Sequence, residues 1–408
     1  MKNMNQPLVY DPANAAIRAN PFPFYEALQE QDPVHWSPAI KSWVITQYDD
    51  VRQVVMSPST MSSDRLRPFY ESLKDERRDI LSGVMRYLNE WLVFKAPPEH
   101  TRLRKMMNGV FSLALVKSRE PAIRAAVDHL LASVDPRVEF DFVEKVAVLL
   151  PAYVILDMMG LPREDFGTIK KWSDDLRLFI GTSQSDRDKY QKARSGADHM
   201  SAYFRDIIAQ RRAAPTDDVI SAMIAATNAS GTLSEDELVA MCMLVLFGGH
   251  ETTTSLLGSA VTSLLSHPDQ LRRLHEEPEL IDSAVEEFLR FDGPSNSIAR
   301  VVAVDHELHG KMLKAGDRVF AMINAANRDP RRFEQPHDLL LDRTPNRHLT
   351  FGQGLHFCLG APLARLETKV CIGTLVARFP AMRQGQGDVK WLDALVMRGP
   401  TQLPLVLQ

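Results

Sequence analysis

A cysteine set among glycines near the carboxyl end constrains the fold more than any other feature of the sequence. Cys358 stands in the segment Phe-Gly-Gln-Gly-Leu-His-Phe-Cys-Leu-Gly, residues 351–360, and an uninterrupted helical pattern follows from Ala361. The first N–H groups of a helix have no partner inside the helix, and the helix dipole favours negative charge there. The position is therefore expected to stabilise a thiolate, and the glycines allow a flat molecule to approach the backbone.

Three interpretations of Cys358 follow from this pattern. The simplest is a buried cysteine in a glycine turn. A zinc site is a weaker alternative, because His356 and Cys358 are close but the N and S ligands of a structural site are not gathered here. A thiolate ligand to haem iron explains a single cysteine in this setting best. The other cysteines, Cys242 and Cys371, lie in apolar helical stretches, which is typical of a reducing compartment without disulfides.

The segment resembles the haem loop of the cytochrome P450 family, which reads Phe-Gly-x-Gly-x-His/Arg-x-Cys-x-Gly, and every specified position matches. The resemblance implies that Cys358 is the metal ligand of haem b, iron protoporphyrin IX. Further landmarks of the family follow in the right order, so the resemblance covers almost the whole chain. The length and the amino terminus look like those of the bacterial cytoplasmic members.

Helical patterning dominates the rest of the chain. Apolar residues recur at helical spacing in 21–31, 116–134, 142–159, 190–212, 234–266, 280–290 and 358–379, whereas strand patterns are confined to 42–46, 301–308 and 318–323. We predict a mainly α fold with minor β structure. Composition shows no break, so residues 1–408 are expected to form a single domain. The resemblance implies the P450 fold, with haem between the long central helix and the helix that follows the cysteine loop.

The segment from Ser57 to Leu92 is less regular and leaves two interpretations open. It is either a mobile covering loop, or it contains a solvated helix around the charged stretch Lys74 to Asp79.

The long helix begins with a capping box, Ser234 with Glu237. Its interior carries Gly-Gly-His-Glu-Thr-Thr-Thr at 248–254, a run of glycines and β-branched residues that conflicts with helix propensity. Such a conflict often marks a functional site, although close helix packing is an alternative explanation. The run resembles the oxygen-activation motif of the family, which implies Glu251 as the catalytic acid and Thr252 as the catalytic alcohol.

Cationic residues are needed to bind the two propionates of a buried haem. His100 and Arg104 lie one helical turn apart and can reach the same edge of a ligand. Each residue alone would most simply be a surface charge. The resemblance implies that His100, Arg104, Arg300 and His356 bind the propionates.

Two further landmarks are structural. Glu287 and Arg290 are three apart on a predicted helix, which alone suggests a surface ion pair of little energetic value. The resemblance implies instead a buried pair that supports the fold behind the haem loop. The stretch Asn327 to Pro330 also resembles a family marker, and His348 is interpreted as a structural histidine.

The resemblance implies a monooxygenase that inserts one atom of dioxygen into a C–H or C=C bond, and so hydroxylates or epoxidises a hydrophobic small molecule. By family position the 61–92 loop and a mainly apolar set of residues line the substrate pocket. The set comprises Leu178, Phe179, Leu244, Phe247, Ser295, Asn296, Ile298, Val396 and Met397. A peroxide-driven peroxygenase is disfavoured because such members lack the acid–alcohol pair. A haem sensor or carrier without turnover is the alternative from another class.

Electrons are expected from separate proteins, because three cysteines cannot ligate an iron–sulfur cluster that needs four. The resemblance implies a ferredoxin and its NAD(P)H-dependent reductase, docking through basic residues that include Arg102, Lys105 and Arg365.

Charge and hydropathy exclude other partners. The net charge is only −4 and no basic block occurs, which argues against nucleic acid and anionic membranes. The longest apolar run, Leu238 to Phe247, is too short for a span of about 20 residues. Met1 to Pro12 lacks the pattern of a signal peptide, so a cytoplasmic location is expected.

Overall fold

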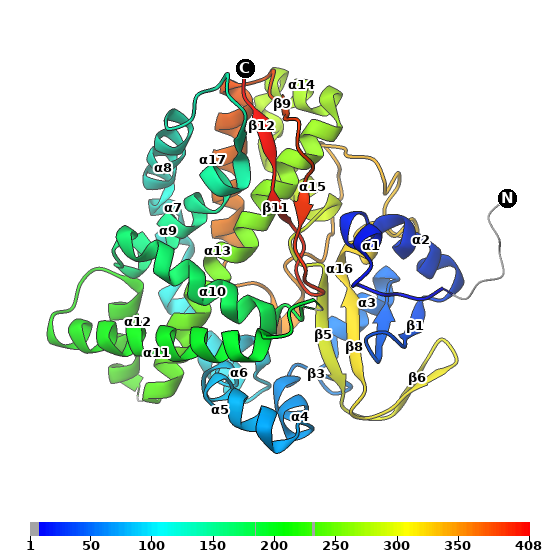
Figure 1. Ribbon diagram of the computed structural model, residues 1–408, viewed down its shortest axis with the longest axis vertical. Coiled ribbons are helices and arrows are strands. Elements are labelled where there is room, and N and C mark those ends of the chain that lie inside the picture. The colour runs from blue at the N-terminus through cyan, green and yellow to red at the C-terminus, as the bar shows by residue number, and fades with distance from the viewer. Residues whose placement is uncertain (1–7, 184, 231–232) are drawn as a thin grey trace.

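The computed structural model describes residues 8–183, 185–230 and 233–408. Residues 1–7, which belong to the segment predicted to lack a signal peptide, lie outside this part. Figure 1 shows helices on one side of the molecule and a sheet with the amino-terminal helices on the other. The mainly α prediction is confirmed. The α-helices are α1 (Ala15–Ala19), α2 (Phe22–Gln31), α3 (Tyr48–Met56), α4 (Leu66–Glu71), α5 (Asp75–Leu88), α6 (Glu99–Val110), α7 (Leu113–Ser118), α8 (Glu120–Ala132), α9 (Leu149–Met159), α10 (Phe166–Ile180), α11 (Lys189–Ala213), α12 (Val219–Ser230), α13 (Glu235–Ser266), α14 (Pro268–Glu276), α15 (Ile281–Phe291), α16 (Ile323–Ala326) and α17 (Ala361–Arg378).

Short helical turns join some of these helices. They are η1 (Leu92–Phe94), the π-helix η2 (Val143–Ala147), η3 (Arg163–Asp165), η4 (Pro278–Leu280) and η5 (Gly354–His356).

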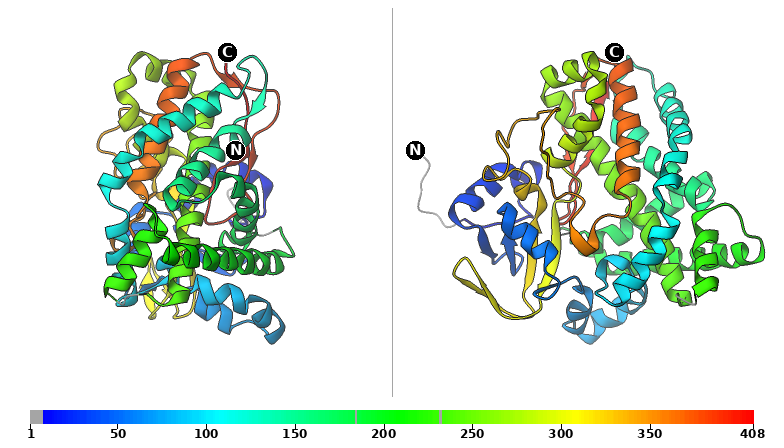
Figure 2. Two further views of the ribbon diagram at one scale, coloured as in Figure 1. Left: turned by 90° about the vertical axis from the view of Figure 1, so that its left-hand side faces the viewer. Right: turned by 180° about the vertical axis from the view of Figure 1, so that it is seen from behind.

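The centre of the helical part is α13, whose side chains are buried along most of its length. Its capping box is present as predicted, with Ser234 and Glu237 each bonding the other's backbone N–H. Helices α9, α11, α15 and α17 pack against it. Figure 2 shows α17, in orange, from behind, where it runs along the upper part of the helical region.

Two predicted helices are divided in the structure. The pattern at 116–134 belongs to α7 and α8, and α8 carries Pro121 in its first turn, where the missing N–H costs no hydrogen bond. The pattern at 142–159 divides into η2 and α9. The helix after the cysteine begins at Ala361, with Gly360 as its cap, so Cys358 precedes the helix rather than starting it.

The main sheet has the strand order β1-β2-β8-β5-β3. Its strands are β1 (Val34–Ser37), β2 (Ser42–Ile45), β3 (Met61–Ser62), β5 (Ser297–Val302) and β8 (Arg318–Met322). Only β2 and β8 pair in parallel; the other pairs are antiparallel. Smaller sheets contain β4 (Phe140–Asp141), β6 (His306–Leu308), β7 (Lys311–Leu313), β9 (Arg383–Gln384), β10 (Lys390–Trp391), β11 (Pro400–Gln402) and β12 (Pro404–Val406). The predicted strand at 301–308 is therefore the end of β5 and a separate strand, β6.

The segment 57–92 is largely helical and contains α4 and α5. The residues from Lys74 to Arg77 are exposed, so the interpretation as a solvated helix is correct for this stretch. Within the described residues, none of the helices combines the length and the apolar character needed to cross a bilayer.

Candidate active site

The cysteine loop is held by its own backbone and by α6. The N–H of Cys358 donates to the carbonyl of Phe351 at 2.9 Å. Gly352 and Gly354 both have φ of +69°, a conformation that other residues rarely adopt, which explains the glycines at these positions. Arg104 Nη1 donates to the carbonyl of Phe357 at 2.6 Å, so α6 is attached to the residue directly before the cysteine.

The side chain of Cys358 can be reached by solvent, but most of its surroundings are protein. The side chain is accessible, yet desolvation raises the pKa of the thiol above its ordinary value. The N–H groups of Gly360 and Ala361 and the charge of Arg104 act in the opposite direction. The predicted effect of the helix start is therefore present, but burial outweighs it in the protein alone. A bound cation is the further charge that would hold a thiolate here.

The four residues predicted to bind propionates come together beside this loop. The rings of His100 and His356 have centroids 4.4 Å apart. Burial, followed by the nearby Arg300, His100 and Arg104, lowers the pKa of His356 to about 3. Arg300 is only 7% exposed, and its burial lowers the pKa of its guanidinium to about 10.

This group combines two arginines that have no carboxylate partner among the described residues with histidine nitrogens that have unused hydrogen-bonding capacity. Both ring nitrogens of His100 are buried without a hydrogen-bond partner among the described residues. Within the same part of the chain, Arg300 forms no ion pair, and its guanidinium donates to the carbonyl of Ala299 at 3.0 Å. Buried cations without a carboxylate are costly, and two propionates would supply the missing charge. The residues present therefore fit the haem that the resemblance implies.

One face of α13 opens onto space inside the protein. Leu244, Gly248 and Thr252, spaced four apart, are accessible in a stretch whose neighbours are mostly buried. A Cβ atom at Gly248 would meet nothing within 4 Å. At Gly249 a Cβ atom would lie 2.7 Å from Cγ1 of Ile155 on α9. The glycine pair thus combines the two explanations that the sequence offered: Gly248 leaves space, and Gly249 allows close helix packing.

Thr252 and Glu251 are bonded in different ways. Thr252 Oγ1 donates to the carbonyl of Gly248 at 3.1 Å, one turn earlier on the accessible face. Glu251 is 6% exposed, and its carboxylate lies 3.4 Å from Lys170 Nζ, 3.3 Å from Arg177 Nε and 3.1 Å from His250 Nε2. Burial raises the pKa of Glu251, but His250, Lys170 and Arg177 together bring it well below its ordinary value.

Lys170 and Arg177 were not predicted from the sequence. They are seven residues apart on α10, which places them on one helix face, but nothing in the sequence links that face to α13.

Glu287 and Arg290 form a fully buried pair with both side chains at 0% exposure. Arg290 donates from Nε and Nη2 to the two carboxylate oxygens at 2.8 Å. Arg343, which was not predicted from the sequence, donates to the same carboxylate at 3.1 Å, and Asn346 does so at 3.0 Å. Arg290 also donates to the carbonyl of Asn327 at 3.0 Å, so the pair ties α15 to the chain that leads to the cysteine loop.

The predicted substrate residues belong to several separate elements. Phe247 is on α13 and packs against Trp91 with ring centroids 5.4 Å apart. The side chain of Ile298 reaches Gly352, where a Cβ atom would lie 3.8 Å away. Leu178 is partly accessible and Phe179 is buried near the end of α10. Ser295 forms a bridge with Met397, beside Val396.

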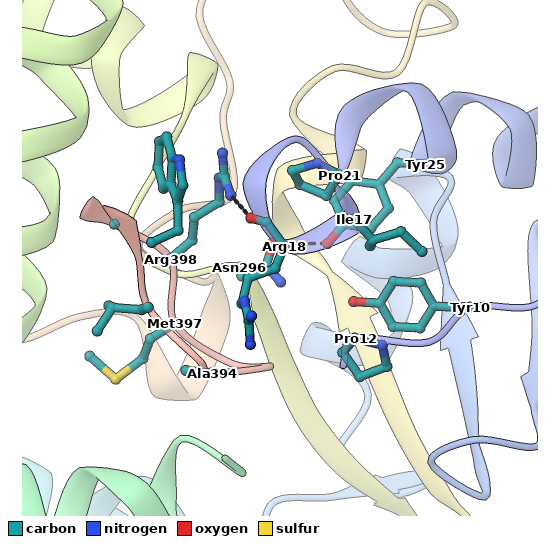
Figure 3. Close-up of a pocket in the computed structure, with 13 residues that line it drawn as sticks. Tyr10, Pro12, Ile17, Arg18, Pro21, Tyr25, Asn296, Ala394, Met397 and Arg398 are labelled. Atoms are coloured by element: carbon teal, nitrogen blue, oxygen red, sulfur yellow. Dashed lines mark hydrogen bonds between the residues drawn. The ribbon is translucent and has the colours of Figure 1, made fainter. Parts of the chain in front are cut away.

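Asn296 has a different role from the one predicted. Its amide accepts from the hydroxyl of Tyr25 at 3.0 Å and donates to the carbonyl of Leu395 at 3.0 Å, so both ends are used inside the protein. Figure 3 shows Asn296 beside Arg18 at a small cavity of about 30 Å³ formed with the amino-terminal segment. Asn296 therefore supports the loop that carries its neighbours.

Two of the predicted docking residues are already paired. Arg102 forms an ion pair with Glu237, and Arg365 donates to Glu286 at 2.6 Å. Glu286 is also 3.2 Å from His348, which supports the structural interpretation of that histidine.

Further arginine side chains lie on one side of the cysteine loop. A hollow of about 470 Å³ beside this loop has a lining in which arginines outnumber carboxylates: it includes Arg52, Arg332, Arg347 and Asp49, together with Phe357. Arg52 Nε donates to Oε1 of Gln353 in the loop at 2.9 Å. This hollow offers a cationic surface next to Cys358.

Comparisons with known proteins agree with this geometry. The sequence profile described as "Cytochrome P450" matches residues 39–403. The vitamin D(3) 25-hydroxylase of Pseudonocardia autotrophica is 37% identical over 394 residues, covering 95% of this chain and 94% of that protein. The mycinamicin IV hydroxylase/epoxidase of Micromonospora griseorubida is 35% identical, covering 94% of each chain. The crystal structure of CYP109E1 from Bacillus megaterium with testosterone superposes with a TM-score of 0.87 at 33% identity, covering 96% of this chain and 99% of that one. The chain therefore belongs to the cytochrome P450 family and is a monooxygenase.

Proposed function

We propose that this monooxygenase binds haem b through Cys358 and hydroxylates or epoxidises a hydrophobic small molecule. The observation that carries the proposal is the group of His100, Arg104, Arg300 and His356, which lies beside the cysteine loop without a carboxylate partner. An isolated cysteine in a glycine turn would not need such a group. Bound haem supplies the activation of dioxygen, with the thiolate donating electron density to the iron.

The residues of α13 control protons at this site. Thr252 holds its hydroxyl on the accessible face, where its oxygen can accept a hydrogen bond from a proton donor in the space in front of Gly248 while its proton is donated to the carbonyl of Gly248. Glu251 lies one residue away, ionised and held by Lys170 and Arg177. We infer that Glu251 carries protons from solvent through its cationic partners, and that Thr252 holds the last proton donor in place. The presence of both residues disfavours a peroxide-driven enzyme.

Electrons come from a ferredoxin and its NAD(P)H-dependent reductase in this proposal. The cationic hollow of Arg52, Arg332 and Arg347 supports an acidic docking partner, because opposite charge speeds association. We expect Arg347→Glu to raise the ferredoxin concentration needed for half-maximal reduction. Arg137→Glu, a matched change at an exposed site between α8 and β4, should have no effect. Equal effects of the two changes would place the docking surface elsewhere.

The pocket supports a substrate with an extended apolar body. Phe179, Phe247 and Ile298 supply apolar surface near the site. Relatives are named for vitamin D(3) and mycinamicin IV, and the CYP109E1 structure contains testosterone. These names support a large hydrophobic molecule for this chain as well. The free thiols of Cys242 and Cys371 support a reducing compartment such as the cytoplasm.

A reduced carbon monoxide spectrum tests the ligand assignment directly. The holoprotein should show the red-shifted band that thiolate ligation gives, and Cys358→Ser should lose it. A histidine-type band in freshly folded protein, or an unchanged band in the variant, would overturn the assignment. Product formation with a ferredoxin system and a hydrophobic substrate then separates an enzyme from a haem carrier.

A further inference from the structure

A cleft of about 310 Å³ opens between the main sheet and the ends of α4 and α10. In Figure 1 these elements meet in the lower part of the molecule, where β5 and β8 approach α4. The charged residues that line the cleft are all cationic: Lys41, Arg65, Lys189, Arg300 and Arg318. Neither aspartate nor glutamate is among its lining residues. A cleft of one sign concentrates ligands of the opposite sign.

The cations have no carboxylate partner in the part of the chain that the structure describes. Arg318 Nη2 donates to the carbonyl of Ile40 at 2.8 Å, and Lys189 Nζ donates to that of Ser183 at 2.6 Å. Arg65 lies over the ring of Phe94, 5.1 Å from its centroid. Burial, followed by the neighbouring Arg300 and Arg318, lowers the pKa of Arg65 to about 10. An anion placed among these groups would relieve their repulsion.

The nearest acids are already engaged. Asp186 and Asp393 attract Lys189, but Asp186 pairs with Lys192 at 2.6 Å. Asp393 pairs with Arg18 at 3.2 Å and accepts from Ser183 at 2.6 Å. Neither acid lines the cleft.

The cations differ in how deeply their side chains are buried. Lys41 and Arg318 are exposed, Arg65 and Lys189 are half-buried, and Arg300 is buried. Because Arg300 is assigned to a haem propionate, the outer four remain for another anion.

Apolar side chains accompany the cations. Phe69 and Phe179 have ring centroids 6.0 Å apart, and Phe320 and Leu395 complete the apolar part of the lining. Phe179 also belongs to the proposed substrate pocket, so the cleft and that pocket share a side chain. The lining thus offers charge toward solvent and apolar surface toward the interior.

We propose, resting on the function proposed above, that this cleft binds the carboxylate of an amphipathic substrate whose apolar body extends past Phe179 into the active site. Arg65, Lys189 and Arg318 hold the head group. Oxidation then falls on a carbon remote from the carboxylate. One oxygen atom of dioxygen enters a C–H bond there, and the other leaves as water after taking two electrons from the redox partners and two protons from solvent.

Spectral titration of the ferric holoprotein tests this proposal. The ligands are pairs of a carboxylic acid and its methyl ester, with linear and polycyclic bodies. At least one acid should bind about tenfold more tightly than its ester, because charge-assisted contacts are lost in the ester. Lys189→Gln combined with Arg318→Gln should weaken binding of that acid roughly tenfold and leave its ester unchanged. Arg137→Gln, outside the cleft, is the control and should change neither.

The carbon monoxide spectrum of each variant separates this proposal from the function on which it rests. If the thiolate band is intact and no acid exceeds its ester in affinity, the carboxylate site is wrong while the monooxygenase stands. Equal weakening of acid and ester, or a loss of haem in the double variant, would also overturn it. In the latter case the outer cations serve the cofactor. A missing thiolate band in the unaltered protein would overturn the proposed function itself.

Discussion

Arg177 Nε lies 3.3 Å from the Glu251 carboxylate, so α10 supplies a cation directly to the acid of α13. Together with His250 and Lys170, this contact holds the pKa of the buried Glu251 carboxyl well below its ordinary value. Helix α10 also carries Phe179 of the proposed pocket, so one helix contacts both the proton path and the substrate region.

Loss of this acid should slow proton delivery without unfolding the protein. We expect Glu251→Gln to reduce turnover about 100-fold, the lower part of the range for a general acid–base group. The measurement is kcat in water and in deuterium oxide, and the solvent isotope effect should rise. Glu235→Gln, at the exposed start of the same helix, should leave both values unchanged. An unaltered isotope effect in Glu251→Gln would exclude this residue from proton transfer.

Thr252→Ala should separate electron use from product formation. The variant keeps haem, substrate and dioxygen binding, because none of these needs the hydroxyl, but the hydroxyl that positions the last proton donor is lost. NAD(P)H consumption should continue while hydrogen peroxide replaces product. Thr262 makes the same bond to Gly258, at 2.8 Å, further along α13, so Thr262→Ala controls for the helix bond alone. An unchanged ratio of product to peroxide in Thr252→Ala would assign the role to another group.

Arg300→Ala should lower haem content more than Arg104→Ala does. Arg300 is 7% exposed, so its removal leaves a buried propionate unpaired, at a cost of about 3–5 kcal/mol. Arg104 is partly accessible and also donates a hydrogen bond to the carbonyl of Phe357. Its loss should therefore weaken both the binding of the propionate and the attachment of the cysteine loop to α6. Haem absorbance per protein and the melting temperature measure both effects. Full occupancy in both variants would show that other groups bind the propionates.

Glu367 should make the protein less stable as pH rises. Its side chain is fully buried on α17, and neither oxygen has a hydrogen-bond partner among the described residues. Burial raises the pKa of this carboxyl well above its ordinary value, so the native state keeps a proton that the unfolded chain releases. Stability therefore falls as pH rises above the unfolded pKa of about 4.3, by about 1.4 kcal/mol per unit until the folded pKa is reached.

The amide variant isolates this effect. The melting temperature of Glu367→Gln relative to the unaltered protein should rise steadily between about pH 5 and pH 8. Glu279→Gln, at an exposed site, should give a constant difference. A constant difference for Glu367→Gln as well would mean that the carboxylate is solvated.

The sequence predicted the parts of the site that are local in the chain. The cysteine loop, the capping box of α13 and the irregular run 248–254 could be identified because each has its own signature over a few residues. Contacts between distant helices could not be identified in this way. Lys170 and Arg177 meet Glu251, and Arg343 meets Glu287, only because the fold brings separate segments together.

Asn296 shows that position in the chain does not reveal the hydrogen-bond partners of a residue. Its position in the chain suggested a pocket residue, but the structure gives both ends of its amide to Tyr25 and Leu395. The donors and acceptors of a side chain can be occupied by residues that are distant in the sequence, and the sequence alone does not identify those partners.

Gly249 has a consequence for altering the specificity of this enzyme. Because a methyl group at this position would collide with Ile155, α13 is already in close contact with α9 and cannot move closer to it to enlarge the site. Gly248, in contrast, has room for a side chain, but that side chain would enter the space beside Thr252. Laboratory evolution toward bulkier compounds should therefore leave α13 intact and collect its useful mutations on α4, α10 and the 295–298 segment, where side chains can be exchanged without displacing the central helix.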